Sequence, residues 1–353
     1  MTTSLHSLLP WTAKPLIING PMGGFAGGSL AAAVTSAGGM GFIGAVYDMA
    51  ALDRELSNAA SALSASPTFE NSRTKEGLLP VGVGFLPFLV KLEDALPVIA
   101  KWKPHSVWLF AAREHADYAT WAERIRPTTG GKTLLWIQTG SVSAGVEVAR
   151  LARPDVLVLQ GSDAGGHGFE KGAGIISLLP EAADALADAG FGDIPLVAAG
   201  GIADARGVAA ALALGAQGVV MGTRFLASKE VMMPHPAYQE AVLEASDGGQ
   251  STVRTKLFDT LRGPNVWPEL YDGRGVVTQT WRDHVSGMSL EEIRTLHKEA
   301  EGREDKGYGL KGRVTMWAGT GVGLVREVKG AGEIATEVRE EARRVVEGLR
   351  TGL

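Results

Sequence analysis

The sequence contains no cysteine. This absence excludes disulfide bonds, thiolate zinc sites, cysteine-ligated iron–sulfur clusters and a catalytic thiol. Neither sign of charge dominates, because 34 Lys and Arg stand against 39 Asp and Glu, for a net charge of −5. The chain therefore has no basic footprint for nucleic acid or for an anionic membrane surface, and we expect neither as a partner.

Long uninterrupted apolar runs are also missing. The longest, Leu30–Val46, contains four glycines together with Thr35 and Ser36, which favours a small-residue helix and a strand over a membrane span. The opening segment MTTSLHSLLPWTAK lacks the basic stretch and apolar core of a secretory signal. A cytoplasmic location is therefore expected, and monomer and dimer both remain open.

Glycine is abundant, with 47 residues and no collagen-like period, which indicates many tight turns between strands and helices. Short apolar segments recur at spacings of roughly 25–40 residues, the length of a βα repeat. Their near-continuous apolar character is typical of parallel strands buried on both faces. Eight such strands are predicted, at Leu16–Asn19, Gly41–Ala45, Pro80–Phe85, Ser106–Phe110, Thr133–Gln138, Val156–Gln160, Pro195–Ala199 and Gly218–Met221.

Alanine-rich helical segments lie between these strands. Ser29 is expected to cap a helix over residues 30–37, and Asp204 a helix over residues 205–214. Eight βα units predict an α/β fold, the (β/α)8 or TIM barrel, with its active site at the carboxyl ends of the strands. The rival is an open doubly wound sheet. It is disfavoured because no Gly-x-Gly-x-x-Gly follows the first strand with an acidic residue about 20 positions later.

The amino-acid composition changes after the eighth predicted strand. Residues 229–328 are richer in Trp, Pro, Arg and Thr and show no clear βα unit. We interpret this stretch as an inserted, mainly helical subdomain over the barrel mouth. The amphipathic segment Glu333–Leu349 then predicts the helix that completes the barrel. The predicted division is a barrel of residues 1–228 with 329–353, and an insert of residues 229–328.

One histidine occupies an unusual context. The buried strand Val156–Gln160 is followed by a run too rich in glycine to continue as a strand or to begin a helix. His167 lies in that run, and its glycine neighbours leave it few side-chain packing partners while allowing close approach to a flat ligand. We therefore expect His167 to face a bound cofactor and to act catalytically. The carboxamide of Gln160 suits the polar edge of a planar heterocycle.

Two glycine motifs follow the seventh and eighth strands, at the place where barrel enzymes commonly bind a phosphate through main-chain N–H groups. Each motif alone makes only a turn, but the two together on adjacent strands favour a phosphate site. The motifs comprise Gly200, Gly201, Met221, Gly222 and Thr223. No metal site is predicted, because the one closely spaced histidine pair, His105 and His115, is not a helical i, i+4 pair.

The turn NGPMGG, the stretch QGSDAGGHG, and AAGGIAD followed by VVMGTRFLASKE resemble the nitronate monooxygenases. The resemblance extends from about Pro15 to Lys229 and continues more loosely beyond. It implies an FMN-dependent (β/α)8 enzyme that oxidises alkyl nitronates with O2 to a carbonyl compound and nitrite. Whether neutral nitroalkanes are also substrates stays open.

The resemblance also implies roles for single residues. His167 matches the family's catalytic histidine, as the base or as the group that binds the nitro oxygens. The family's flavin-contacting positions correspond to Met22, Gln160 and Gly165. Its phosphate-binding positions correspond to Gly201, Val220, Met221, Gly222 and Thr223. The sequence departs from the family pattern at two positions: Asp163 replaces the usual Glu, and Gly84 stands where many members have Asn or Gln.

Two alternatives remain. FMN-dependent NAD(P)H reductases that act on enoyl thioesters or quinones share similar loops. A flavin- or phosphate-binding barrel without turnover, such as a carrier or sensor, is the alternative from another class.

Overall fold

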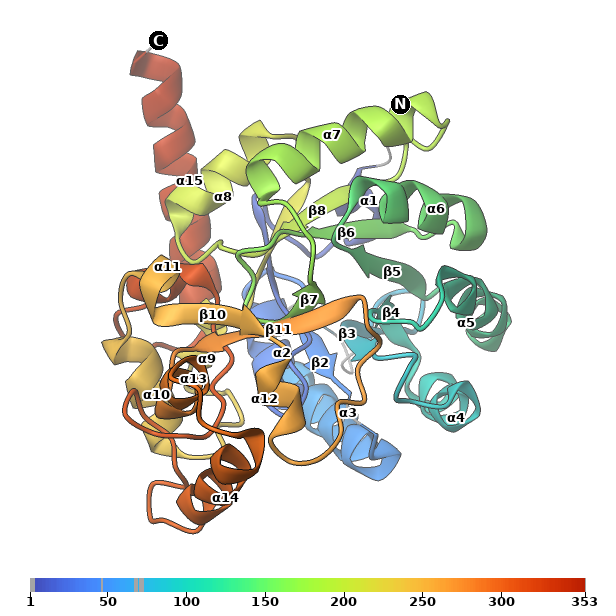
Figure 1. Cartoon of the computed structure of the whole chain (residues 1–353). Coiled ribbons are helices and arrows are strands. Elements are labelled where there is room, and N and C mark those ends of the chain that lie inside the picture. The colour runs from blue at the N-terminus through green and yellow to red at the C-terminus, as the bar shows by residue number, and fades with distance from the viewer. Residues whose placement is uncertain (1–3, 46, 67–68, 70–72, 353) are drawn as a thin grey trace.

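The computed structural model describes residues 4–45, 47–66, 69 and 73–352. Residues 1–3 of the opening segment and Val46 of the apolar run lie outside the described residues. A parallel sheet forms the centre of the molecule (Figure 1). Its eight strands are β1 (Leu16–Asn19), β2 (Phe42–Gly44), β3 (Leu79–Phe85), β4 (Pro104–Leu109), β5 (Leu134–Thr139), β6 (Val156–Gln160), β8 (Leu196–Ala199) and β9 (Gly218–Met221).

All eight predicted strands are therefore confirmed, and their bounds differ from the prediction by at most two residues. The strand order is β1-β9-β8-β6-β5-β4-β3-β2. Main-chain pairing beside β1 and β2 is limited to isolated bridges, from Ile18 to Met40 and from Gly23 to Gly44. The buried Asn19 side chain completes the contact, since its Oδ1 accepts from the Phe42 N–H (3.0 Å) and its Nδ2 donates to the Phe42 carbonyl (2.8 Å). The sheet thus closes into the predicted barrel.

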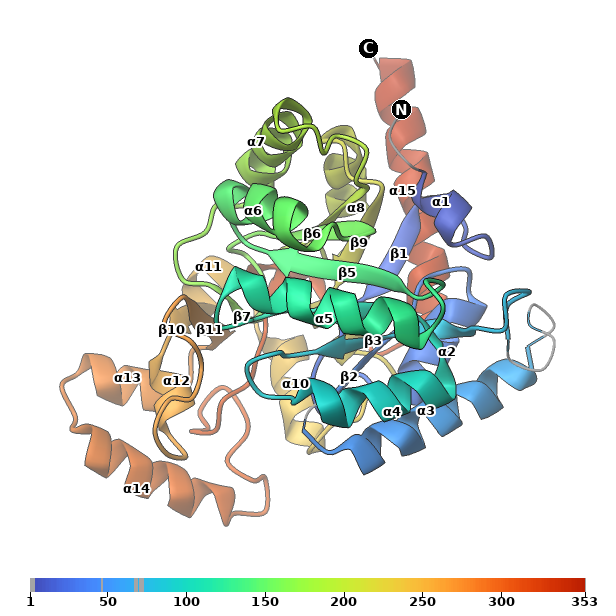
Figure 2. The ribbon, with the colours of Figure 1, turned by 90° about the vertical axis from the view of Figure 1, so that its right-hand side faces the viewer.

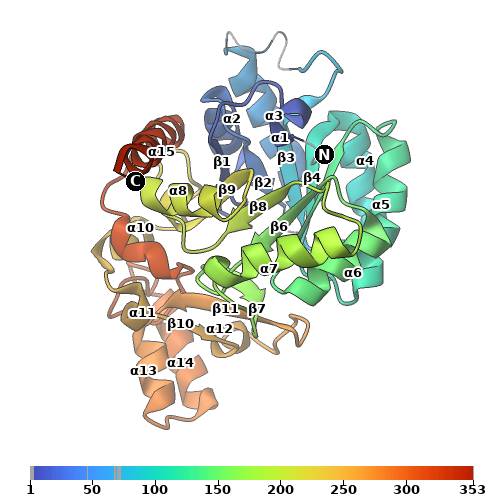
Figure 3. The same ribbon diagram turned by 90° about the horizontal axis from the view of Figure 1, so that it is seen from above.

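Helices surround the barrel, and the carboxyl-terminal one packs beside α8 and α2 (Figure 3). Strand residues alternate between the two buried faces: Val156 and Val158 point into the barrel, while Leu157 and Leu159 pack toward the helices. This double burial explains the near-continuous apolar strands. The surrounding helices are α2 (Gly28–Ser36), α3 (Met49–Ser64), α4 (Leu92–Trp102), α5 (His115–Thr128), α6 (Val142–Ala152), α7 (Ile175–Asp188), α8 (Ala205–Ala213) and α15 (Ala331–Gly352).

The first residues of α8 and α2 can be compared with the two predicted helix caps, Asp204 and Ser29. Asp204 caps α8 as predicted, because its carboxylate accepts from the N–H groups of residues 206 and 207 (2.9 and 3.2 Å). The Ser29 prediction is wrong: α2 begins at Gly28, two residues before the predicted start, so Ser29 lies inside the helix. The Gly28 N–H instead donates to the Glu55 carboxylate of α3 (2.7 Å), so a neighbouring helix supplies the cap.

Residues 229–328 are mainly helical, as expected, and they also contain two strands. Strands β10 (Thr252–Thr255) and β11 (Tyr271–Val276) form a three-stranded antiparallel sheet with β7 (Gly166–Phe169), beside the barrel (Figure 2). The helices are α10 (Pro236–Glu244), α11 (Gly248–Ser251), α12 (Leu257–Thr260), α13 (Gln279–Val285), α14 (Leu290–Glu301) and the 3-10 helix η2 (Thr320–Leu324). The division into two domains stays a prediction.

Strand β7 overturns a second expectation. The glycine run around His167 was expected not to continue as a strand, yet residues 166–169 form a strand that pairs with β11. Glycine weakens a strand, but main-chain pairing with another segment compensates for that weakness.

None of the helices within the described ranges is both long and apolar enough to cross a membrane.

His105 is a buried titratable group on β4. Its Nδ1 lies 3.3 Å from the Ser106 hydroxyl, and its ring meets Trp11 edge-on at 4.6 Å. Burial lowers the pKa of His105 to about 4. The unfolded chain takes up this proton near pH 6.5, so protonation favours unfolding as the pH falls from 6.5 toward 4.

We therefore predict that His105→Gln reduces the acid sensitivity of the fold. The free energy of unfolding of the natural chain, relative to the variant, should fall by about 3 kcal/mol between pH 7 and pH 4. Urea denaturation at several pH values measures this difference. A difference that is constant with pH would contradict the prediction.

Candidate active site

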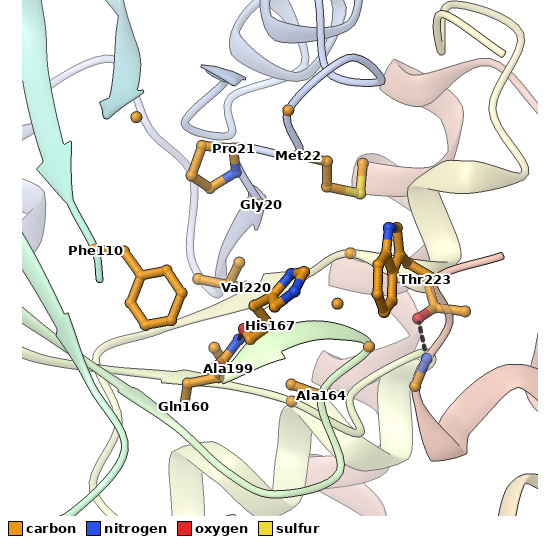
Figure 4. Close-up of a pocket in the computed structure, with 18 of the residues that line it drawn as sticks. Gly20, Pro21, Met22, Phe110, Gln160, Ala164, His167, Ala199, Val220 and Thr223 are labelled. Carbon is orange, nitrogen blue, oxygen red and sulfur yellow. Dashed lines mark hydrogen bonds between the residues drawn. The ribbon is translucent and has the colours of Figure 1, made fainter. Parts of the chain in front are cut away.

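A cavity of about 400 Å³ opens at the carboxyl ends of the barrel strands. Glycine-rich main chain after β1, β8 and β9 forms one part of its wall, and aromatic rings form another. In Figure 4 the His167 imidazole lies in the middle of the lining residues, between Met22 on one side and Gln160 and Ala164 on the other. The cavity lies where a (β/α)8 fold places its active site.

The turn after β8 exposes its main chain to the cavity, because it consists of glycines. Gly200 and Gly201 have φ angles of 100° and 76°, a region that residues with a side chain rarely adopt. After β9, Gly222 leads into the short helix α9 (Thr223–Leu226). The Thr223 Oγ1 accepts from the Gly319 N–H at 2.9 Å, which leaves its own hydrogen for another acceptor (Figure 4).

Nearly all of the predicted site residues line this cavity. They are Met22, Gln160, Gly165, His167, Gly200, Gly201, Val220, Gly222 and Thr223. Met221 is the exception, since it does not line the cavity, and its part in a phosphate site stays a prediction. Strand residues alternate in direction, so Val220 faces the barrel interior while Met221 packs in the core toward the helices.

The two departures from the family pattern each have a local explanation. A β-carbon at Gly84 would lie 2.4 Å from the Pro21 Cβ, so Pro21 occupies the space that a larger residue would need. The Asp163 Oδ1 accepts from the Thr320 hydroxyl (3.0 Å), and the Asp163 carbonyl accepts from the Thr320 N–H (3.0 Å). Asp163 therefore fastens η2 to the loop that precedes β7.

Gln138, one residue before the end of β5, lines the cavity and was missed by the sequence reasoning. Its Oε1 accepts from the Trp108 indole N–H at 3.2 Å. Its Nε2 is buried and has no hydrogen-bond partner within the described part of the chain, although the residue lines the cavity. A buried unpaired donor at a cavity wall fits a ligand that carries an acceptor. The signal was a polar residue that ends an apolar strand, as at Gln160.

Gln160 itself has a structural contact. Its Nε2 donates to the carbonyl of His167 at 3.2 Å, so the end of β6 holds the main chain of β7. This contact ties the position of His167 directly to a barrel strand.

His167 is tightly packed, which contradicts the expectation of few side-chain partners. Its Nε2 lies 2.7 Å from the Asp259 Oδ1, and the two side chains are 12% and 6% exposed. The Trp267 ring stacks on the imidazole at a centroid distance of 3.6 Å and an interplanar angle of 8°, and Trp317 lies at 4.7 Å. The neighbours of His167 in sequence are glycines, but side chains from the region 229–328 pack against its ring instead. The composition of that region marked it as distinct, but no spacing linked it to His167.

An eight-stranded parallel barrel with a glycine-lined cavity and a histidine at its mouth defines an enzyme of the (β/α)8 class. The family model described as nitronate monooxygenase matches residues 120–341. The nitronate monooxygenase npaC of Metarhizium robertsii is 45% identical over 346 residues, covering 97% of this chain and 95% of the relative. A nitronate monooxygenase of Neurospora crassa is 36% identical and covers 99% and 94%. This chain belongs to the nitronate monooxygenase family and is an oxidoreductase.

Solved structures agree on the fold. FabK from Thermotoga maritima superposes with a TM-score of 0.73 at 27% identity, covering 100% of both chains. The nitroalkane oxidase from Streptomyces ansochromogenes also gives 0.73, at 23% identity, covering 98% of this chain and 100% of the other, and this likeness concerns the fold alone.

Gly165 tests the packing of this site. A β-carbon there would lie 2.4 Å from the main chain of Ala318 and Gly319. We predict that Gly165→Ala lowers the free energy of unfolding by about 1–3 kcal/mol, because the two loops must separate. At Gly172, a β-carbon meets the nearest atom at 3.5 Å, an ordinary contact. Urea denaturation should therefore show little change for the control Gly172→Ala, and equal losses for both variants would refute the packing argument.

Proposed function

We propose that the protein oxidises alkyl nitronates with O2 in an FMN-dependent reaction that yields a carbonyl compound and nitrite. The observation that supports this most directly is one cavity that His167 shares with the glycine turns after β8 and β9. Membership of the nitronate monooxygenase family supports the same reaction.

The residues present fit an FMN molecule. Main chain at Gly200, Gly201 and Gly222 with the Thr223 hydroxyl would hold the phosphate, as in other barrels of this kind. The unpaired Nε2 of Gln138 would donate to an acceptor on the ring system. Apolar contacts to the ring would come from Met22 and Val220, which also line the cavity. The chemistry that FMN supplies when bound is the oxidation of the substrate carbanion.

His167 would act before oxidation, on a neutral nitroalkane. The Cα–H bond breaks, its electron pair moves into the nitro group, and the proton binds to a ring nitrogen of the imidazole. An imidazole suits this transfer because it exchanges protons near neutral pH. Trp267 and Trp317 pack against the ring and limit the access of water. A nitronate that is supplied ready-made requires no base.

Spectroscopy and oxygen uptake test the proposal. We predict that the purified protein, offered FMN, shows a bound-flavin spectrum, and that it consumes oxygen and forms nitrite with ethyl nitronate. Rapid anaerobic bleaching of the flavin by NADH, without nitronate turnover, would favour the reductase alternative. A flavin spectrum with no turnover of any nitronate would favour a carrier or sensor.

We predict that His167→Asn separates the two forms of the substrate. The kcat/KM for neutral nitroethane should fall by about two orders of magnitude or more, while that for ethyl nitronate falls by less than about tenfold. His115→Asn is the matched control, because His115 pairs with Glu147 on the barrel exterior. Equal losses on both substrates would instead assign His167 to substrate binding.

A further inference from the structure

We propose that Asp259 is the positioning residue that fixes the tautomer of His167 and leaves Nδ1 as the nitrogen that receives the substrate proton. The kinetic part of this proposal rests on the proposed base function of His167. The structural part does not, because it concerns a hydrogen bond that can be observed without turnover.

The hydrogen bond itself determines the tautomer. Asp259 Oδ1 lies 2.7 Å from Nε2 of His167, and both side chains are largely, though not fully, buried. An ionised carboxylate only accepts hydrogen bonds, so Nε2 must carry the hydrogen and donate it. A neutral imidazole has one N–H, which leaves the lone pair on Nδ1. No residue in the described ranges hydrogen-bonds Nδ1, so this nitrogen is available to a substrate.

Among the described residues, Asp259 forms an ion pair with His167 and with no other side chain. Its Oδ2 is buried without a hydrogen-bond partner among the residues described. A buried carboxylate is costly unless it is paired. Proton transfer to Nδ1 would convert His167 into a cation beside this carboxylate, so the pair would become compensated at the step where the base acts.

The surrounding residues hold this geometry. Trp267 stacks on the imidazole, and Trp317 contacts it from another side, which prevents rotation of the ring. Arg294 of α14 donates to the carbonyls of Thr260 (2.8 Å) and Gly263 (3.2 Å). It therefore braces the end of α12, which carries Asp259, and the start of the loop that leads to Trp267.

Asp259 also faces space that allows a conservative test. It lines a second cavity of about 450 Å³, and His167 lines both this cavity and the one at the barrel mouth. A side chain longer by one methylene can be accommodated there. Asp283 offers a matched control, because it is a buried aspartate in the region 229–328 that pairs with Arg313 (2.5 Å) and does not contact His167.

The direct test is ¹⁵N NMR of histidine-labelled protein at a pH where the ring is neutral, with His167 assigned through the His167→Asn variant. We expect a protonated Nε2 and an unprotonated Nδ1. In Asp259→Asn this preference should be lost, because an amide can donate as well as accept. The Asp283→Asn control should retain it. A protonated Nδ1 in the natural chain, or signals insensitive to Asp259→Asn, would overturn the proposal.

Kinetics supply the second readout. Asp259→Asn should lower kcat/KM for neutral nitroethane by about 100-fold and that for ethyl nitronate by less than about tenfold, and Asp259→Glu should recover much of the loss. Asp283→Asn should preserve the ratio of the two activities. A nitroethane activity unchanged in Asp259→Asn would contradict the positioning role. Absence of nitronate turnover in the natural chain would instead refute the proposed function, and the NMR result would still decide the role of Asp259.

Discussion

Main-chain pairing between β7 and β11 is the interaction on which the site depends. Its register sets His167 opposite Gly273 and so brings a barrel loop against a segment more than 100 residues later in the chain. The barrel contributes the imidazole, and the later segment contributes the side chains that contact it. A buried ion pair between Arg254 of β10 and Asp272 of β11 reinforces the outer strands of the same small sheet. This sheet acts together with the contacts of Gln160 and Asp163 to fix the conformation of the glycine-rich loop.

The barrel could be predicted from the sequence because its strands are buried on both faces and therefore read as short apolar runs. The residues of the cavity wall could also be predicted, because the carboxyl ends of parallel strands lie together at one end of a barrel. The motif was treated as a unit, but neighbouring strand residues point in opposite directions, so the Met221 side chain does not line the cavity. Gln138 was overlooked for lack of a glycine motif, although it lies next to the last residue of its strand, much as Gln160 ends β6.

The partners of His167 could not be predicted in this way. Asp259, Trp267 and Trp317 lie in a region with no repeated spacing, and their contacts depend on how that region folds back over the barrel. Strand β7 was missed for a related reason, since its strand character comes from a distant partner and its own sequence favours turns. Local patterns report local propensity, whereas these contacts depend on tertiary packing.

Asn19 illustrates that a polar residue at the cavity end of a strand need not take part in chemistry. Both polar atoms of its side chain bond the main chain of Phe42, its Nδ2 also donates to the Gly20 carbonyl, and the residue does not line the cavity. The first two strands of the sheet are therefore joined by a carboxamide where main-chain pairing is sparse. An open sheet would present two unpaired borders on which another chain could add a strand and aggregate. One asparagine thus helps to protect the protein from edge-to-edge self-association.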